Sequence, residues 1–195
     1  GHLSKEDQML IIEALALAGT KKITFAGGEP TLCPWLHELI TLAKNLGMTT
    51  MIVTNGSQLT KEYLEPLVGI LDWCTLSIDS LNAETNRMAG RVKRGNLEGT
   101  APDEAHYLQL IDLIKSHGIK YKLNTVVHAY NHEEDLSRFV LETKPERWKV
   151  FQALPITGQN DEHINDFLVS DEQFEAFLER HKQCPQLVPE NNAAM

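Results

Sequence analysis

Apolar residues recur along the chain with two alternating periods. A spacing of three to four residues predicts helices at residues 4–18, 35–46, 61–70, 103–116, 133–143 and 170–182. Short runs between them predict strands at residues 22–26, 50–54, 74–79, 120–127 and 148–154. Ser170 and Gln173 have the spacing of a capping box that opens the last helix. This alternation favours parallel strands joined by right-handed crossovers, so the fold class is α/β, either an open sheet or a barrel.

Four of these strands carry one polar and one apolar face, whereas buried parallel strands are usually apolar throughout. A period of two groups the polar-face residues as follows: Lys22, Thr24 and Ala26; Thr75, Ser77 and Asp79; Lys120, Lys122 and Asn124; Arg147 and Lys149. If helices cover the apolar faces, the polar faces line an interior or a cleft. The alternative is that these residues mark strand ends in solvent, because lysine is rarely buried.

The overall charge makes the bases on these strands more notable. The formal net charge of the 195 residues is −9, which argues against binding to nucleic-acid backbones or anionic membranes. A local cluster of bases in an acidic protein therefore suggests a specific polyanion site. We expect Lys22, Lys122, Arg147 and Lys149 to form this pocket, and a triphosphate is its natural ligand.

Cysteine content and hydropathy bear on the cellular compartment in which the protein is expected. No apolar stretch approaches the length of a transmembrane helix, and no signal peptide is visible. Cys33, Cys74 and Cys184 are odd in number and lack CxxC or CxxxC spacing. This pattern fits a reducing compartment and predicts a cytoplasmic protein whose cysteines are small apolar core residues rather than a metal site.

Two turns lie where consecutive predicted strands end. Gly27-Gly28-Glu29-Pro30 follows the first strand, and Asn55-Gly56-Ser57 follows the second. Glycines allow a close approach of the backbone to a ligand, and a glutamate can accept a hydrogen bond from a ligand ammonium. Ordinary turn chemistry explains each turn taken singly. Because both lie at the same edge of a parallel sheet, we expect them to mark the ligand-binding edge.

One long irregular segment covers residues 87–102 and contains Arg87, Arg91, Lys93 and Arg94. A solvated basic loop and a loop that closes over a ligand explain this composition equally well.

These residues resemble the radical S-adenosylmethionine (SAM) superfamily and, within it, the viperin family. The matching stretches are residues 21–32 (KKITFAGGEPTL), 77–80 (SIDS), 89–91 (AGR), 121–127 (YKLNTVV), 131–136 (NHEEDL), 147–152 (RWKVFQ) and 188–195 (VPENNAAM). GGEP is shared by many radical SAM enzymes, whereas RWKVFQ and VPENN are much more specific. The similarity covers nearly the whole chain.

The resemblance implies a single domain over residues 1–195 with a partial (β/α)6 TIM-like barrel. It also implies SAM, a [4Fe–4S] cluster, an external electron donor and a monomer. Viperin-like enzymes are antiviral lyases that act on a nucleoside triphosphate such as CTP, UTP or GTP. A 5′-deoxyadenosyl radical removes the 4′ hydrogen of the ribose. Loss of the 3′ hydroxyl as water and reduction give the 3′-deoxy-3′,4′-didehydro nucleotide.

Site residues follow from the resemblance by position. Residues that would bind SAM are Gly27, Gly28, Glu29, Pro30, Asn55, Ser77, Arg91 and Asn124. Gly27–Pro30 would hold the methionyl end, and Arg91 would suit the carboxylate. Residues that would bind the nucleotide are Lys22, Thr24, Lys122, Arg147 and Lys149. The triphosphate bases agree with the strand-face argument above. The resemblance assigns no catalytic side chain here.

The sequence departs from the family pattern in one respect. Radical SAM enzymes hold their cluster through a CxxxCxxC loop, which this chain lacks. The family places that loop shortly before the first helix, where this chain begins. We therefore expect an excerpt, incomplete at both ends and inactive alone. The alternatives are another radical SAM enzyme, such as a relative of 7-carboxy-7-deazaguanine synthase, and a non-catalytic nucleotide-binding module.

Overall fold

The computed structural model describes residues 3–92, 101–155 and 164–190. Lys93 and Arg94 of the basic segment, and residues 191–195 of the VPENNAAM stretch, lie outside these ranges. The helices are α1 (Lys5–Leu17), α2 (Leu36–Asn45), α3 (Lys61–Leu64), α4 (Ala83–Met88), α5 (Glu104–Ser116), α6 (Ser137–Thr143) and α7 (Asp171–Arg180), with 3₁₀ turns η1 (Pro30–Leu32), η2 (Glu65–Leu67) and η3 (Ile164–Asp166). The strands are β1 (Lys22–Phe25), β2 (Thr49–Thr54), β3 (Trp73–Ser77), β4 (Lys120–Val127), β5 (Trp148–Gln152) and β6 (Leu187–Glu190).

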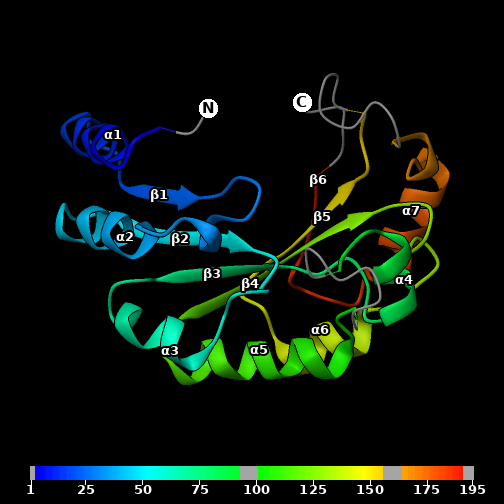
Figure 1. Cartoon of the computed structure of the whole chain (residues 1–195). Helices are drawn as coiled ribbons and strands as arrows, with labels where there is room; N and C mark the ends of the chain where they lie inside the picture. Colours follow the sequence, from blue (N-terminus) through cyan, green and yellow to red (C-terminus); the bar gives the residue numbers. More distant parts are fainter. Residues whose placement is uncertain (1–2, 93–100, 156–163, 191–195) are drawn as a thin grey trace. The chain divides into compact units, whose positions relative to one another are not determined.

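The strands are hydrogen-bonded in the order in which they occur along the chain, β1 to β6. The β1–β2, β2–β3, β4–β5 and β5–β6 pairs are parallel. This order with intervening helices confirms the predicted α/β class (Figure 1). Residue contacts divide the chain into two compact units. Unit 1 comprises Gly1–Leu76 and Leu110–Tyr121, and unit 2 comprises Ser77–Gln109 and Lys122–Met195.

Two helices are shorter than the sequence predicts. The helix expected at residues 61–70 ends at Leu64, and η2 continues it with a tighter turn around Pro66, which lacks an N–H for helical bonding. The helix expected at residues 133–143 begins only at Ser137. Its N-cap is Leu136, whose N–H donates to the imidazole Nε2 of His181 at 2.9 Å. A tertiary contact therefore sets this boundary, and local sequence does not reveal it.

Four elements were not expected from the sequence, namely α4, β6, η1 and η3. Helix α4 lies just before and within the segment interpreted as irregular, and Asn82 caps it by accepting hydrogen bonds from the N–H groups of Glu84 and Thr85. Strand β6 is only four residues long and contains Pro189. η1 forms directly at the GGEP turn, where Pro30 is its first residue. The capping box of Ser170 and Gln173 at the start of α7 is confirmed.

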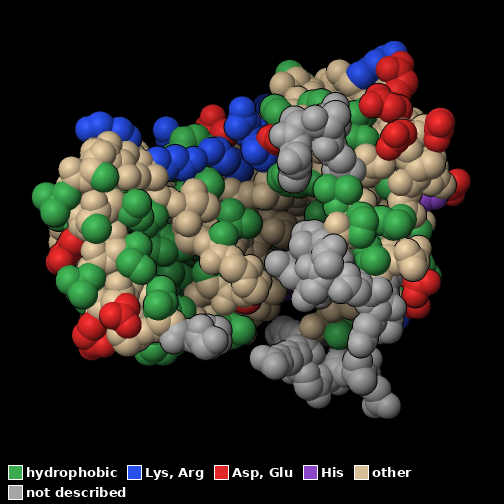
Figure 2. All heavy atoms as spheres, turned by 90° about the horizontal axis from the view of Figure 1, so that it is seen from above, with side chains coloured by type: hydrophobic (Ala, Val, Ile, Leu, Met, Phe, Trp, Pro, Cys, Tyr) green, Lys and Arg blue, Asp and Glu red, His purple; other side chains and the backbone are tan. Residues whose placement is uncertain are grey.

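Unit 1 packs helices against the first strands. Helices α1 and α2 contact each other, and a cluster of Ile12, Leu39, Ala43 and Met48 is buried between them and the sheet. Ile23 and Phe25 of β1 pack against this cluster. Helix α1 also carries exposed apolar side chains, namely Leu10, Ile11, Leu15 and Leu17. Figure 2 shows that hydrophobic side chains also lie on the surface of the described part of the chain.

Unit 2 is built around Trp148 of β5. Its indole ring meets Phe177 and His181 of the α7 region edge-on, and its Nε1 donates to Thr125 Oγ1 at 2.9 Å. Thr125 in turn donates to the carbonyl of Ile78 at 2.7 Å. The core of unit 2 therefore connects β5 to β4 and to the end of β3.

Among the described residues, no helix has both the length and the apolar character needed to cross a membrane.

Candidate functional site

The GGEP turn leaves open space beside its backbone. Gly27 has a φ of 141°, a conformation that side-chain-bearing residues rarely adopt. A Cβ added at Gly27 or at Gly28 would meet no heavy atom within 4 Å. A Cβ at position 28 would therefore not clash with other atoms of the protein, so packing does not explain why this residue is glycine. An open cradle that a Cβ would fill is what close approach of a ligand to the backbone requires, so these residues fit the methionyl end of SAM.

Glu29 connects this turn to the turn after β2. Its Oε1 accepts hydrogen bonds from the backbone and the hydroxyl of Thr31 and from the hydroxyl of Thr54, the last at 2.7 Å. Its Oε2 accepts one from the backbone N–H of Asn55 at 2.8 Å. A carboxylate offers about four acceptor positions, two on each oxygen. Oε2 therefore keeps acceptor capacity for a ligand ammonium, although most of the carboxylate holds the two turns together.

The side chain of Tyr63 is half-buried near this carboxylate. Burial, reinforced by the negative charge of Glu29, raises the pKa of Tyr63 to about 12. The phenol of Tyr63 thus stays neutral. Among the contacts of the described residues in unit 1, the Glu29 carboxylate is not paired with a cation.

The predicted strand faces are confirmed for β1 and β4. In β1, Lys22 and Thr24 are exposed, while Ile23 and Phe25 are partly buried. In β4, Lys122 and Asn124 are partly exposed, while Leu123 and Thr125 are buried.

The bases of unit 2 lie on neighbouring strands. Asn124 of β4 is the register partner of Lys149 of β5, and the N–H of Leu123 donates to the carbonyl of Arg147. The side chains of Asn124 and Lys149 therefore share a face of the sheet. Arg147 is exposed and Lys149 is partly buried. This arrangement supports a common anion-binding surface for the bases of unit 2.

An acidic residue that the sequence did not single out joins these bases. Glu190 of β6 lies 2.5 Å from the Lys149 ammonium, and both side chains are about one-third exposed. A hydrogen bond and the charge of Lys149, with the charge of Arg147, lower the pKa of Glu190. A nucleotide phosphate would have to compete with this carboxylate for Lys149.

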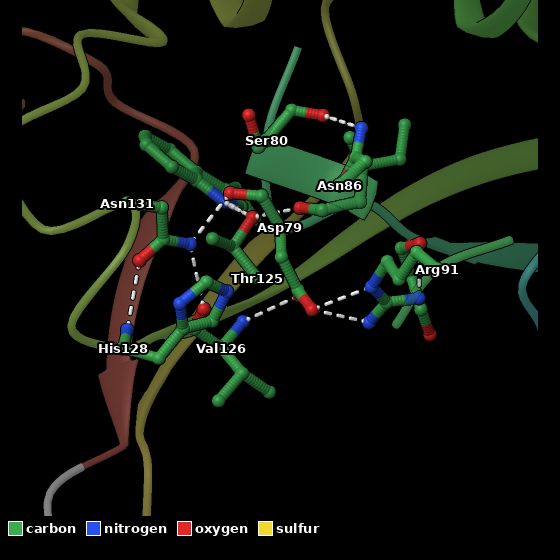
Figure 3. Close-up of polar contacts among 11 residues, drawn as sticks. Asp79, Ser80, Asn86, Arg91, Thr125, Val126, His128 and Asn131 are labelled. Atoms are coloured by element: carbon green, nitrogen blue, oxygen red, sulfur yellow. Dashed lines mark hydrogen bonds and ion pairs between the residues drawn. The ribbon is translucent and has the colours of Figure 1, made fainter. Parts of the chain in front are cut away.

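A second polar cluster lies where β3 and β4 end, and Figure 3 shows it. Arg91 donates through Nε to Asp79 Oδ2 at 2.6 Å, and its Nη2 forms an ion pair with the same oxygen. Its Nη1 lies 3.3 Å from the carbonyl oxygen of Ser77. The structure therefore brings together Ser77 and Arg91, both predicted to bind SAM. The sequence placed Asp79 on the face of Ser77 but gave it no role.

The predicted site residues fall into both units. Unit 1 contains the GGEP turn with Asn55, Lys22 and Thr24, and unit 2 contains Ser77, Arg91, Asn124 and the other bases. Each set is arranged within its own unit as described. That the sets form one site stays a prediction.

The described residues do not fit a [4Fe–4S] cluster. None of them form a group of three or more His, Cys, Asp or Glu side chains that could hold a metal. All three cysteines are free; Cys74 and Cys184 are buried, as expected, and Cys33 is partly exposed. Burial raises the pKa of the Cys74 thiol above its usual range, which disfavours the thiolate that an iron site needs.

Unit 2 also contains a pocket of ≈ 360 Å³. Its lining residues are Leu81, Asn82, Glu104, Glu134, Asp135, Arg138 and Phe139. None of them was predicted as a site residue. Glu134 and Asp135 were expected in the first turn of a helix, but they lie before α6, where Glu134 accepts a hydrogen bond from Ser80 at 2.7 Å.

Comparison with known proteins gives the family. Residues 1–142 match the model of the Radical SAM superfamily. The chain is 51% identical over 195 residues to an S-adenosylmethionine-dependent nucleotide dehydratase of Flammeovirga pacifica, covering 100% of this chain and 66% of that protein. It is 48% identical over 193 residues to a protein of the same name from Lacinutrix mariniflava, covering 98% of this chain and 40% of that protein. The chain thus spans less than two thirds of these relatives.

A solved structure gives the fold. Streptococcus suis SuiB bound to S-adenosylmethionine has a TM-score of 0.71 at 20% identity, over 98% of this chain and 44% of SuiB. This likeness supports the radical SAM fold that the sequence predicts. The superfamily uses SAM and a [4Fe–4S] cluster, which are the expected cofactors. With a match over most of its length to the superfamily model, the chain belongs to the radical SAM superfamily.

Proposed function

We propose that the protein to which this chain belongs is a SAM-dependent nucleotide dehydratase. It would convert a nucleoside triphosphate to its 3′-deoxy-3′,4′-didehydro form. The observation that carries the proposal is the row of bases on the strand faces. The GGEP turn would not need these bases to bind SAM, so they favour a second, anionic ligand. Lys122, Arg147 and Lys149 offer an anion site on adjacent strands of one unit. The names of the relatives support the same reaction class.

The residues of unit 1 would hold SAM through the GGEP turn. Gly27 and Gly28 leave room for the methionyl group, and the remaining acceptor capacity of Glu29 Oε2 suits its ammonium. Asn55 is fixed by Glu29 at the adjacent turn, and its Oδ1 accepts a hydrogen bond from the N–H of Ser57 at 2.8 Å. The turns are thus preorganised rather than ordered on binding.

The residues of unit 2 would complete both binding sites. Arg91 donates charge-assisted hydrogen bonds suited to the SAM carboxylate, and Ser77 and Asn124 lie on polar strand faces. Lys122, Arg147 and Lys149 would bind the triphosphate with Lys22 and Thr24 of β1. Binding of the triphosphate would place the ribose, and enclosure of the site would exclude water from reactive intermediates.

When bound, the [4Fe–4S] cluster and SAM supply the radical chemistry of the superfamily. The described residues of this chain do not offer a set of ligands for the cluster, and we propose that another part of the protein supplies them. We further propose an external electron donor, a monomer whose residues 1–195 form one partial-barrel domain, and a cytoplasmic location. Free cysteines and the absence of a membrane-spanning helix among the described residues agree with that location.

The test is anaerobic incubation of the full-length, cluster-reconstituted protein with SAM and each nucleoside triphosphate in turn. We expect one triphosphate to stimulate 5′-deoxyadenosine formation strongly and to yield a nucleotide product that is lighter than the triphosphate by one water. SAM cleavage that no triphosphate stimulates would point to another radical SAM activity. Nucleotide binding without SAM cleavage would indicate a non-catalytic module.

A further inference from the structure

Asp79 occupies the centre of the cluster in Figure 3. Only 6% of the residue is exposed. Its Oδ1 accepts a hydrogen bond from the backbone N–H of Val126 at 2.9 Å, and its backbone carbonyl accepts one from Asn131 Nδ2 at 2.7 Å. Because these bonds connect the end of β3 to the end of β4, the carboxylate has a fixed position. Its second oxygen is left to Arg91.

Arg91 is held on one side only. Within the described residues, its bonds to Asp79 and to the Ser77 carbonyl use three of the five guanidinium N–H groups. One N–H on Nη1 and one on Nη2 are left for a ligand. The side chain is 25% exposed, whereas that of Asp79 is 8% exposed. The guanidinium therefore has a buried edge on Asp79 and a more accessible remainder.

The positive charge in this cluster belongs to Arg91, because the histidine beside Asp79 is neutral. Figure 3 shows the His128 ring close to Asp79 and Val126. Burial lowers the pKa of His128, so its imidazole is neutral near pH 7. The N–H of Arg91 also donates to the carbonyl of Asn86 at 2.8 Å, and Asn86 is itself buried and bonded to the carbonyls of Ser80 and Pro102. The backbone of Arg91 and its side chain are thus both anchored.

We propose that Asp79 is a positioning residue for the carboxylate of SAM and acts by aiming the guanidinium of Arg91. The inference rests on the proposed function, because it takes SAM as the ligand of Arg91. A flexible arginine loses side-chain entropy when it binds a carboxylate. A buried partner that fixes the guanidinium beforehand removes much of this cost from the binding step.

Removal of the Asp79 charge could physically either strengthen or weaken SAM binding. The direction of the change in SAM affinity therefore tests the proposal. Asp79 carries a negative charge close to the proposed position of the ligand carboxylate, and like charges repel. If repulsion dominated, removal of the charge would tighten SAM binding. In Asp79→Asn, however, the amide NH2 would face either Val126 N–H or Arg91, so one donor would meet another. We therefore expect misplacement of Arg91 and weaker binding.

The experiment compares SAM with decarboxylated SAM, which lacks the carboxylate. Affinities are measured by anaerobic calorimetry on the full-length, cluster-reconstituted protein. Asp79→Asn should weaken SAM binding roughly tenfold or more and change the affinity for decarboxylated SAM by less than about twofold. Glu142→Gln, which removes an exposed charge of unit 2, is the matched control and should change neither affinity.

A cycle with Arg91 separates positioning from a general structural role. If Asp79 acts through Arg91, the Asp79→Asn/Arg91→Ala double variant should bind SAM no more weakly than Arg91→Ala does. Additive losses, equal losses for both ligands, or tighter SAM binding by Asp79→Asn would overturn the proposal.

Two further outcomes stay distinguishable. If Asp79→Asn does not fold, Arg91→Lys serves instead, because it keeps the charge but loses the fork that Asp79 fixes. It should weaken SAM binding and leave decarboxylated SAM unaffected, and equal effects on both would overturn the proposal. Failure of the wild-type protein to bind SAM would instead contradict the proposed function.

Discussion

The carboxylate of Glu29 accepts a hydrogen bond from the backbone of the turn after β2, with its Oε2 2.8 Å from the nitrogen of Asn55. Its other oxygen accepts hydrogen bonds from Thr31 and Thr54. One side chain thus fixes the turns after β1 and β2 relative to each other. The glutamate of the GGEP turn therefore has a structural role that does not depend on the proposed contact with SAM.

Glu29→Gln should lower both stability and SAM affinity. The amide would present an NH2 to groups that already donate, so at least one donor would lose its acceptor, at a cost of about 1.5–3 kcal/mol. Urea denaturation and SAM calorimetry measure the two effects. Glu38→Gln, at an exposed ion pair with Lys5 in the same unit, should change stability by less than about 0.5 kcal/mol. Wild-type stability in Glu29→Gln would show that this network is not needed.

Lys122→Ala should weaken nucleotide binding far more than SAM binding. A charge-assisted hydrogen bond to phosphate contributes about 1.5–3 kcal/mol, or roughly 10- to 100-fold in Kd. Lys120→Ala is the control, because Lys120 lies on the same face of β4 but its ammonium is 4.8 Å from the centroid of the Trp73 ring. It should alter nucleotide affinity by less than about threefold. Equal losses for nucleotide and SAM in Lys122→Ala would refute the pocket assignment.

Glu190→Gln should tighten nucleotide binding. The substitution frees the Lys149 ammonium from its ion pair and removes a negative charge near the proposed triphosphate site. Because partly exposed ion pairs are weak and screened by salt, we expect a modest improvement of roughly 1.5- to 5-fold, which should shrink in high salt. Calorimetry at two salt concentrations provides the measurement. Weaker binding would mean that Glu190 orients Lys149 instead of competing for it.

Acidification below pH 6.5 should destabilise the protein. Burial lowers the pKa values of His37, His128 and His181, and His181 has no exposed surface. In the unfolded chain these histidines bind protons near pH 6.5, while the folded state resists protonation. Stability is therefore full above that pH and falls as the pH drops towards the folded pKa values.

The expected slope is up to about 1.4 kcal/mol per pH unit for each such histidine. Urea denaturation between pH 7.5 and 5.5 measures it. His181→Gln should be less stable at pH 7.5, since His181 accepts the N–H of Leu136, but its stability should depend less on pH. An unchanged slope in this variant would show that His181 does not contribute.

Sequence reasoning predicted what local patterns determine. The period of two in β1 and β4 gave the polar faces of Lys22, Lys122 and Asn124, because burial on one face of a strand requires alternation. Helix caps with short-range partners, such as Ser170 with Gln173, were equally visible.

Contacts between distant residues could not be predicted in this way. Glu190 and Lys149 are 41 positions apart, and Asp79 meets Val126 across 47 positions. The start of α6 depends on His181, which is 45 residues from Leu136. In each case strand order and packing determine which distant residue becomes the partner. A local sequence pattern can therefore identify a polar residue but cannot identify the residue that it contacts.

The central claim is that the SAM-binding turn and the bases serve one reaction on a nucleotide. The most direct measurement uses a nucleoside triphosphate deuterated at C4′ with the full-length, cluster-reconstituted protein and SAM. The claim predicts nucleotide-dependent 5′-deoxyadenosine that is heavier by one deuterium, together with the dehydrated nucleotide. Formation of 5′-deoxyadenosine without deuterium, at a rate that no nucleotide changes, would contradict it.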